Sequence, residues 1–376
     1  TIEPDESLRI CKAIDIVVRG EGERTIVNLV NNLDKLSDFK GITFREGENI
    51  ISNEDVEQIS NLDDIPMPRR DLLDMDFYCK PMIARGLYGR FTTIFTSRGC
   101  YGRCNFCAGY KVFTGCVRYH SPERVLSEIE EIISRYKVDY LYFAEDEFLS
   151  NRKRAEELCA LLIKKNINKK IKWIAQIRPE KNRVNKELVK LVQRAGCVQL
   201  EIGFESGSQE ELDRMNKRAK VEDYYYITRL LREAGMCFQA NFILRYPGQT
   251  MEDLAKTISL IKDSRASLVQ ANAFWALPGS RAYEELEEKY TKLRGIFNIG
   301  ADENLSAISD EEYSKVINAA YNPLKSRVNK KDIILFHFFH KPLFLFDFSV
   351  RYILTRVLRA LIVVIRKKYF FLEVWQ

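Results

Sequence analysis

The chain has 376 residues, of which 46% are hydrophobic and 30% are charged, and its formal net charge is +6. This composition is that of a soluble globular protein with enough apolar material for about two or three domains. The basic excess lies in residues 325–376, which leaves the rest of the chain close to neutral and argues against a large nucleic-acid-binding surface on the main body.

The first part of the chain is typical of the end of an α/β domain. Residues 14–18 predict a short strand, and an amphipathic helix follows with Ile26, Leu29, Val30 and Leu33 on one face. Residues 41–45 and 49–52 bracket a Glu-Gly pair and predict a hairpin. The turn-rich residues 63–68 then predict a linker without helix. The chain opens without a secretory signal and begins as if within a domain, so we expect further residues upstream.

Strands and helices alternate regularly from about residue 90, which indicates a parallel sheet with right-handed crossovers. The predicted fold class is α/β, with a partial (β/α)6 TIM-like barrel. Strands are predicted at 92–96, 140–144, 171–176, 198–202, 237–244 and 268–273, and helices at 122–136, 152–165, 186–195, 221–234 and 251–263. Chemistry in such barrels takes place on the loops that leave the carboxyl ends of the strands.

One of these loops carries Cys100, Cys104 and Cys107, spaced C-x3-C-x2-C. Soft thiolates are the ligands that iron–sulfur clusters and zinc select. A cubane of four irons held by three cysteines would keep one iron without a protein ligand. The alternative is a zinc loop closed by a distant ligand such as Cys116, although closed zinc sites usually contain two C-x-x-C pairs. The chain has 9 cysteines and 3 histidines, which indicates a reducing compartment and disfavours a histidine-based metal site.

The cysteine spacing, with Phe106 before the last cysteine, resembles the signature of the radical S-adenosylmethionine (SAM) superfamily. The resemblance extends over residues 90–285. It implies a [4Fe–4S] cluster on Cys100, Cys104 and Cys107, with SAM chelating the fourth iron. One electron from the cluster would then cleave SAM to methionine and a 5′-deoxyadenosyl radical, which takes a hydrogen atom from the substrate.

Further turns match this family in the order expected along the chain. The resemblance implies that Glu145 or Asp146, after the second strand, binds the SAM amino group; a solvated acidic turn is the alternative. Arg178 ends the third strand and could pair with the SAM carboxylate, because a planar guanidinium suits carboxylates.

Two later turns complete the predicted cofactor site. Glu205 and Ser206 belong to a Gly-x-Glu-Ser-Gly turn, and the family uses this glutamate to hold the SAM ribose or amino-acid end. Arg245 stands in the Pro-Gly-x-Thr turn near the adenine, at a position where the family usually has glycine. The barrel interior shows no recognisable specificity motif.

Residues 1–85 resemble the segment that joins a cobalamin-binding domain to the barrel in one branch of this superfamily. The resemblance rests on Val17–Glu23 with Thr25, and on Leu62–Pro68. That branch includes enzymes similar to the anaerobic magnesium-protoporphyrin monomethyl ester cyclase. The D-x-H-x-x-G stretch that would ligate cobalt does not occur in this sequence, so we do not expect this chain alone to bind cobalamin well.

The sequence therefore predicts a cobalamin-domain remnant and linker (1–88), a radical SAM barrel (89–290) and a helical, basic and apolar extension (291–376). The extension either packs on the barrel or contacts a membrane surface. We expect a cytoplasmic enzyme with a small-molecule substrate and an electron donor such as flavodoxin or ferredoxin. Cobalamin-linked methylation or oxidative cyclisation is the first choice of reaction. The rivals are tRNA methylthiolation and a non-enzymatic zinc scaffold.

Overall fold

The computed structural model describes residues 2–289 and 305–316. The chain divides into two compact units, Thr1–Asn322 and Pro323–Gln376, and all described residues belong to the first. None of the helices in these described ranges is long and apolar enough to cross a membrane. The predicted basic, apolar tail lies outside them, and the division at residues 88 and 290 stays a prediction.

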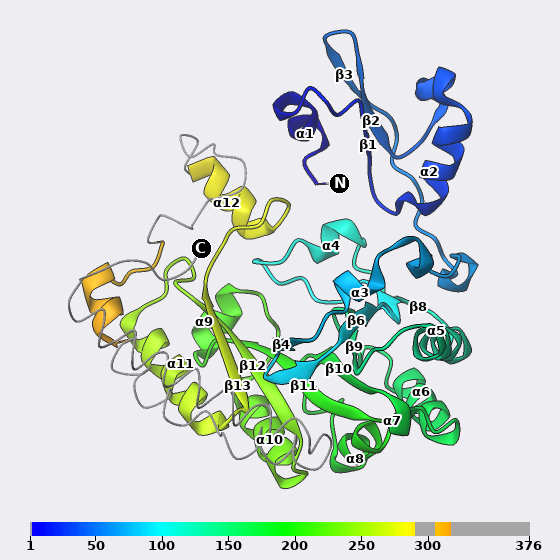
Figure 1. Ribbon diagram of the computed structural model, residues 1–376. Helices are drawn as coiled ribbons and strands as arrows, with labels where there is room; N and C mark the ends of the chain where they lie inside the picture. The colour runs from blue at the N-terminus through cyan, green and yellow to red at the C-terminus, as the bar shows by residue number, and fades with distance from the viewer. Residues whose placement is uncertain (1, 290–304, 317–376) are drawn as a thin grey trace, which may run out of the picture. The chain divides into compact units, whose positions relative to one another are not determined.

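The centre of the first unit is a sheet of six strands, all parallel, in the order β13-β12-β11-β10-β9-β6 (Figure 1). Strands that follow one another in the sequence are neighbours, and β6 and β13 form its two edges. The predicted (β/α)6 partial barrel is thus confirmed. The strands are β6 (Phe91–Ile94), β9 (Tyr140–Phe143), β10 (Lys172–Ile177), β11 (Cys197–Glu205), β12 (Cys237–Leu244) and β13 (Leu268–Ala273).

The crossover helices lie along the outer side of this sheet (Figure 1). They agree with the predicted helices to within one residue at either end, because strong side-chain caps fix where most of them begin. Ser121 caps the first, and Thr250 and Asp253 form a full capping box on the last. These helices are α5 (Pro122–Arg135), α6 (Arg152–Lys164), α8 (Lys186–Arg194), α10 (Val221–Glu233) and α11 (Met251–Ser264).

The N-terminal residues form a small antiparallel sheet of β1 (Ile16–Val18), β2 (Ile42–Glu46) and β3 (Asn49–Ser52), with α1 (Pro4–Ile10) and α2 (Gly22–Asn31). The predicted hairpin is β2–β3, and Leu29, Ile42 and Phe44 form its core. On α2, Ile26 and Val30 are 46% and 65% exposed, so the predicted apolar face is only partly covered. The linker prediction was wrong for its first residues, because a 3-10 turn, η2 (Leu62–Asp64), forms where Asn61 supplies a cap.

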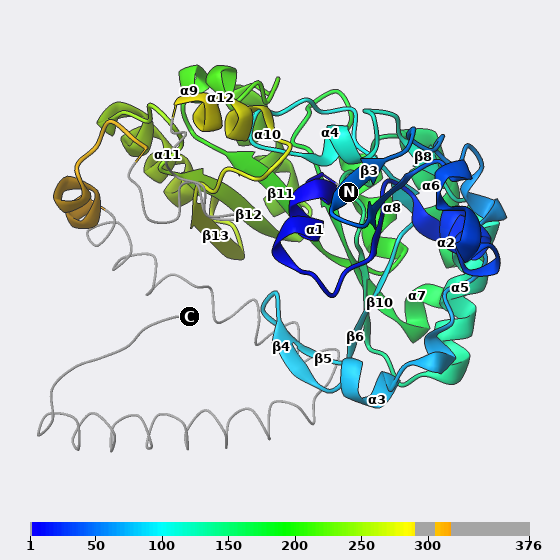
Figure 2. The same ribbon diagram turned by 90° about the horizontal axis from the view of Figure 1, so that it is seen from above.

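Several short elements complete the unit. The hairpin of β4 (Met82–Ala84) and β5 (Leu87–Gly89) was not predicted; it lies near α3 and β6 (Figure 2). Strands β7 (Ser97–Arg98) and β8 (Arg118–Tyr119) pair antiparallel. The others are η1 (Leu33–Asp38), η3 (Arg70–Leu72), α3 (Met75–Tyr78), α4 (Gly109–Val112), α7 (Ile167–Lys170), α9 (Gln209–Arg214) and α12 (Arg281–Lys289).

Candidate functional site

The three clustered cysteines lie on a loop that is closed at its base. Strands β7 and β8 pair on either side of it, through Ser97 with Tyr119 and Arg98 with Arg118. Before the first cysteine, Gly99 has φ +94, and a side chain there would collide with the carbonyl of Cys116. Only glycine fits this left-handed, crowded position. The β7–β8 pairing and Gly99 therefore bring both ends of the loop to the carboxyl end of β6.

Two of the three sulfurs accept backbone hydrogen bonds. The N–H of Gly102 donates to Cys100 Sγ and that of Gly109 to Cys107 Sγ, each at 3.3 Å. Burial raises the pKa of both thiols, and the two N–H groups partly oppose it by favouring the thiolate. A bound metal would favour the thiolate much more strongly, because ligation requires loss of the thiol proton.

The spacing of the sulfurs bears on the choice between zinc and a cluster. In the described part of the chain, no three Cys, His, Asp or Glu side chains are placed to hold one metal ion. Cys116, the proposed fourth ligand of a zinc site, is exposed. A four-iron cubane is larger than a single ion and holds its ligands farther apart. The described residues therefore form no closed zinc site, and three thiolates on one loop are soft donors of the kind that iron–sulfur clusters select.

Arg178 lies beside the cysteine loop and is 7% exposed. Its Nη1 is 3.6 Å from Cys104 Sγ, its Nε donates to Glu180 at 3.0 Å, and its Nη2 donates to the carbonyl of Lys217 at 2.5 Å. A Cβ on Gly102 would approach Nη1 to 2.7 Å, so glycine at this position leaves room for the guanidinium. Arg178, the predicted partner of the SAM carboxylate, is thus held against the sulfur of Cys104.

Glu205 is connected to the cysteine loop through Lys217. Lys217 Nζ is 2.8 Å from Glu205 Oε1 and 5.9 Å from the ring centroid of Phe106. Glu205 has φ +65, which is uncommon for a residue other than glycine, and the register with β12 shifts next to it. Such conformations persist only where surrounding contacts enforce them, and they concentrate at functional sites.

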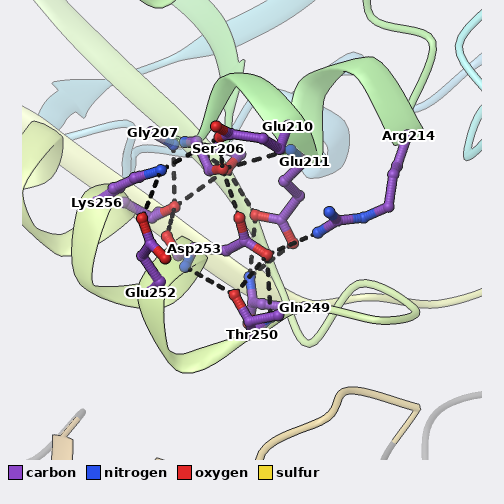
Figure 3. A network of polar contacts seen from close by, with 12 residues as sticks. Ser206, Gly207, Glu210, Glu211, Arg214, Gln249, Thr250, Glu252, Asp253 and Lys256 are labelled. Carbon is purple, nitrogen blue, oxygen red and sulfur yellow. Dashed lines mark hydrogen bonds and ion pairs between the residues drawn. The ribbon is translucent and has the colours of Figure 1, made fainter.

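Ser206 faces the opposite way, into a buried polar network (Figure 3). Its hydroxyl donates to Glu211 at 2.6 Å and lies 3.2 Å from the hydroxyl of Thr257. It is fully buried, and the network joins β11 and α9 to the start of α11. The structure therefore does not bring Ser206 together with the cysteines.

Glu145 and Asp146 line a cavity of about 610 Å³ beside the cysteine loop. Thr96 and Ser97 donate to Glu145 Oε2, whereas Glu145 Oε1 is buried and no described residue bonds to it. Burial raises the pKa of both carboxyl groups. The charge of Asp146 also raises the pKa of Cys100 and Cys107, after the larger effect of burial.

The N-terminal residues form the far wall of this cavity and are tied to the cysteine loop by charge. Arg98 donates to Glu21 at 2.8 Å and to Glu23 at 2.5 Å, and Arg118 donates to Glu21 at 2.6 Å. Burial alone would raise the pKa of Glu21, but the two guanidinium groups outweigh burial and lower it. Glu21 is therefore a buried anion between two arginines that flank the loop.

Arg245 points away from the cysteines. Its guanidinium is 2.9 Å from Asp310 and lies over the ring of Tyr313, 4.2 Å from the centroid. Its φ is +59, a left-handed conformation that glycine adopts without steric cost, which explains why glycine suits this turn. The predicted adenine-side residue thus anchors residues 305–316, whose Leu305 and Ala307 form backbone hydrogen bonds to Gly248 and Gln249.

Comparisons with known proteins agree with this geometry. Residues 94–261 match the family model of the radical SAM superfamily. An uncharacterized methyltransferase of Pyrococcus horikoshii is 30% identical over 354 residues, which cover 90% of this chain and 74% of that protein. The chain belongs to the radical SAM superfamily.

Other relatives of this radical SAM chain are longer. It is 31% identical to the anaerobic magnesium-protoporphyrin IX monomethyl ester cyclase of Cereibacter sphaeroides over 282 residues, 73% of this chain and 45% of the cyclase. The methyltransferase TsrM of Kitasatospora setae, solved with cobalamin and a [4Fe–4S] cluster, has a TM-score of 0.60 at 16% identity, with 75% of this chain and 55% of that one covered. The cobalamin-dependent enzyme OxsB has a TM-score of 0.59 at 22% identity, with 86% and 47% covered. These two likenesses confirm the fold, and the chain spans about half of the cyclase and of both solved structures.

Sequence reasoning missed the residues that surround Arg178 in this radical SAM site. Tyr101 donates to Glu180 at 2.8 Å, and its ring lies 5.4 Å from the Arg178 guanidinium carbon. Lys217 follows α9, a helix of 6 residues whose pattern is too short to predict. The only signal was the charged Asn-Lys-Arg run that contains Lys217, and nothing in that run indicates a partner.

Glu147 is the other missed carboxyl group, and it gives a pH-dependent prediction. Burial raises its pKa to about 8, although the N–H groups of Arg178 and Leu149 partly oppose this. The unfolded carboxyl loses its proton above about pH 4.5, and the folded one keeps it to about pH 8. The unfolded state therefore binds fewer protons in this window, so the free energy of unfolding falls as pH rises. The loss attributable to this group is at most about 5 kcal/mol.

Glu147→Gln is expected to remove this contribution, because an amide does not titrate. Urea unfolding of anaerobic wild-type and variant protein at about pH 5, 6.5 and 8 measures it. The difference in stability between the two proteins should change steadily in the variant's favour as pH rises. A difference that stays constant over this range contradicts the raised pKa.

Proposed function

We propose that this chain is a SAM-cleaving radical enzyme in which Cys100, Cys104 and Cys107 hold a [4Fe–4S] cluster with one open iron. The observation that carries the proposal is the closed cysteine loop at the carboxyl end of β6, with N–H donors on two sulfurs and Arg178 on the third. Such a cluster supplies one electron to the bound SAM sulfonium, whose carbon–sulfur bond breaks to give methionine and the 5′-deoxyadenosyl radical. The chain itself positions SAM and excludes water.

Asp146 is the better candidate for the SAM amino group. The side chain of Asp146 is exposed at the cavity beside the cysteine loop, whereas that of Glu145 is buried, so Asp146 can reach the amino group of a bound SAM. Glu145 already accepts bonds from Thr96 and Ser97 through one oxygen and would complete the same wall of the cavity. Glu205, fixed by Lys217, is proposed to hold the ribose or amino-acid end of SAM.

Arg178 is proposed to serve the cluster rather than the SAM carboxylate. A cation that donates to a cluster sulfur stabilises the more negative, reduced state, so its loss lowers the reduction potential. Arg178→Gln is therefore expected to lower the midpoint potential of the reconstituted cluster, measured by redox titration with electron paramagnetic resonance (EPR) detection.

A matched control is Arg183→Gln, because Arg183 also binds Glu180 but donates to no cysteine. It should leave the potential unchanged. If Arg178 instead binds the SAM carboxylate, the affinity for SAM falls in Arg178→Gln while the potential stays as in the wild type, and that result contradicts the assignment.

The reaction itself is proposed from the relatives. Methylation or oxidative cyclisation of a small molecule fits the activities for which these relatives are named, and cobalamin, which is bound in the solved structure of TsrM, is proposed as a third cofactor. A flavodoxin or ferredoxin is the proposed electron donor. A cytoplasmic location and a membrane contact of the tail stay predictions, because the tail lies outside the described residues.

Anaerobic reconstitution tests the proposal. Metal analysis should find about four iron and four sulfide per chain and no stoichiometric zinc. The reduced protein should then form 5′-deoxyadenosine from SAM, and the assay is run with and without added cobalamin to test the third cofactor. One zinc per chain, with no iron retained, would support the scaffold alternative instead.

A further inference from the structure

A second cavity, of about 450 Å³, lies within the barrel on the inner side of β10–β13. Glu205 lines it and is also proposed to hold SAM, so the cavity and the proposed SAM site share this residue. Its volume is within the range of small-molecule sites. Its polar lining includes Arg85, Gln176, Glu201, Gln239, Asn241 and Asn272.

The cavity is polar because alternate residues of three neighbouring strands are polar. Glu201 is in register with Gln239, and Asn241 with Gln270. Since side chains alternate between the two faces of a strand, these rows share the inner face. A barrel interior that serves only as a core is filled by branched apolar side chains. Amides and carboxylates at these positions indicate a binding surface rather than packing.

The charges that line the cavity are neutralised by one another or by near neighbours. Arg85, at the tip of the β4–β5 hairpin, forms an ion pair with Glu201 and lies 3.9 Å from the ring centroid of Tyr142. The Tyr142 hydroxyl donates to Glu201 at 3.0 Å. Glu205 is paired with Lys217. A ligand that enters this cavity therefore meets no uncompensated charge, which favours an uncharged one.

The amide groups are only partly used within the protein. Gln239 Nε2 donates to Asn241 Oδ1 at 2.8 Å and to Gln270 Oε1 at 2.9 Å. Within residues 2–289 and 305–316, no hydrogen bond is formed by the side chain of Gln176 or Asn272, and Asn272 is exposed. Each amide offers donors and an acceptor, and the amides here come from three strands, β10, β12 and β13. Hydroxyl groups both donate and accept hydrogen bonds, so a ligand with several hydroxyls can bond to several of these amides at once.

We infer that the barrel cavity binds the substrate through an uncharged, hydroxyl-rich moiety of the sugar class. This inference rests on the proposed function, because the cavity adjoins the proposed SAM site at Glu205. The side chains that bind this moiety are the amides of Gln239, Asn241, Gln270 and Asn272. The wall offers a planar apolar ligand few partners, since Phe242 and Ile243 are the apolar residues in the cavity lining.

Saturation-transfer difference NMR on the anaerobic, cluster-loaded full chain tests the inference. The probes are the methyl glycosides of glucose, galactose and ribose, with methoxycyclohexane as the matched ring without hydroxyls. At least one glycoside should give a saturable signal that methoxycyclohexane does not give. Asn241→Leu and Asn272→Leu should each raise its Kd about three- to tenfold, the effect of one lost hydrogen bond.

Gln199→Leu is the matched control, because Gln199 lies on β11 outside the cavity lining and its Nε2 has no partner in the described structure. It should leave the glycoside Kd unchanged. Asn272→Leu removes no hydrogen bond that the structure shows, so it keeps the test valid if Asn241→Leu fails to fold. No glycoside signal, an equal signal from methoxycyclohexane, or a Kd that Asn272→Leu leaves unchanged overturns the inference.

The same preparations separate this inference from the proposed function. Formation of 5′-deoxyadenosine without glycoside binding overturns the cavity assignment and leaves the radical enzyme intact. Glycoside binding without any cleavage of SAM overturns the proposed function instead.

Discussion

Cys104→Ala is expected to abolish both the iron content and the SAM-cleaving activity, with 5′-deoxyadenosine falling to the level of the assay without protein. Cys104 is 6% exposed and is the sulfur that Arg178 contacts, so no other thiol can take its place without moving the loop. A cubane with two protein ligands would be held too weakly to survive anaerobic desalting. Iron analysis, the visible absorbance of the cluster and the 5′-deoxyadenosine assay measure the effect.

Cys116→Ala provides the matched control, since Cys116 is the exposed cysteine that a zinc site would need as its fourth ligand. It should retain iron and activity within about twofold of the wild type, a difference smaller than about 0.5 kcal/mol in activation free energy. The reverse pattern, with Cys116 essential and Cys104 dispensable, would show that the loop holds a different metal.

Gly207→Ala is expected to destabilise the fold by about 3 kcal/mol, at the upper end of what one added methyl group costs in a packed interior. A Cβ at this position would lie 2.4 Å from the carbonyl oxygen of Lys256 and 2.7 Å from Cα of Thr257. Both are backbone atoms of α11, so the clash cannot be relieved by turning a side chain. Separating the helix from β11 would also stretch the 2.9 Å bond from Gly207 N–H to Thr257 Oγ1.

Chemical unfolding under anaerobic conditions measures this loss, with Gly22→Ala as the control. Gly22 is the first residue of α2, where a Cβ would lie 3.3 Å from a methyl group of Val18 that can adjust. The control should change stability by less than about 1 kcal/mol. Equal stabilities for Gly207→Ala and the wild type would mean that α11 does not pack on the turn as described.

The role of Gly207 also shows where sequence reasoning reached its limit. The Gly-x-Glu-Ser-Gly turn predicted a flexible backbone at the barrel mouth, yet Gly207 is needed because α11 approaches it closely. Gly207 and Thr257 are far apart in the sequence, so the sequence does not indicate that they are in contact. A single sequence indicates that a glycine stands in a turn, but it does not reveal which distant backbone packs against it.

Hydrophobic periodicity predicted the sheet and its crossover helices well, because parallel strands and amphipathic helices leave strong local patterns. The β4–β5 hairpin and α9 were missed, since three-residue strands and a six-residue helix are too short to leave one. The polar alternation of Gln239 with Asn241, and of Gln270 with Asn272, is visible in the sequence. Its meaning depends on which face of the sheet is inner, and that requires the fold.

The positions of charged partners were the least predictable part of the site. Arg178 was expected to pair with the SAM carboxylate. In the structure, its hydrogen bonds to Glu180 and to the carbonyl of Lys217 hold it against Cys104. Arg245 forms an ion pair with Asp310 that the sequence did not indicate, and its place near the adenine stays a prediction. Long side chains can reach several partners from one backbone position, so sequence order alone does not select among them.

EPR spectroscopy of the reduced, reconstituted protein, recorded with and without SAM, tests whether one iron of the cluster is open to SAM. If a three-cysteine loop leaves one iron open, SAM must coordinate that iron and change the g-values of the cluster signal. We expect such a change in the wild type and no cluster signal in Cys104→Ala. A cluster signal that is identical with and without saturating SAM would contradict it, because the iron would then have no vacant position for the cofactor.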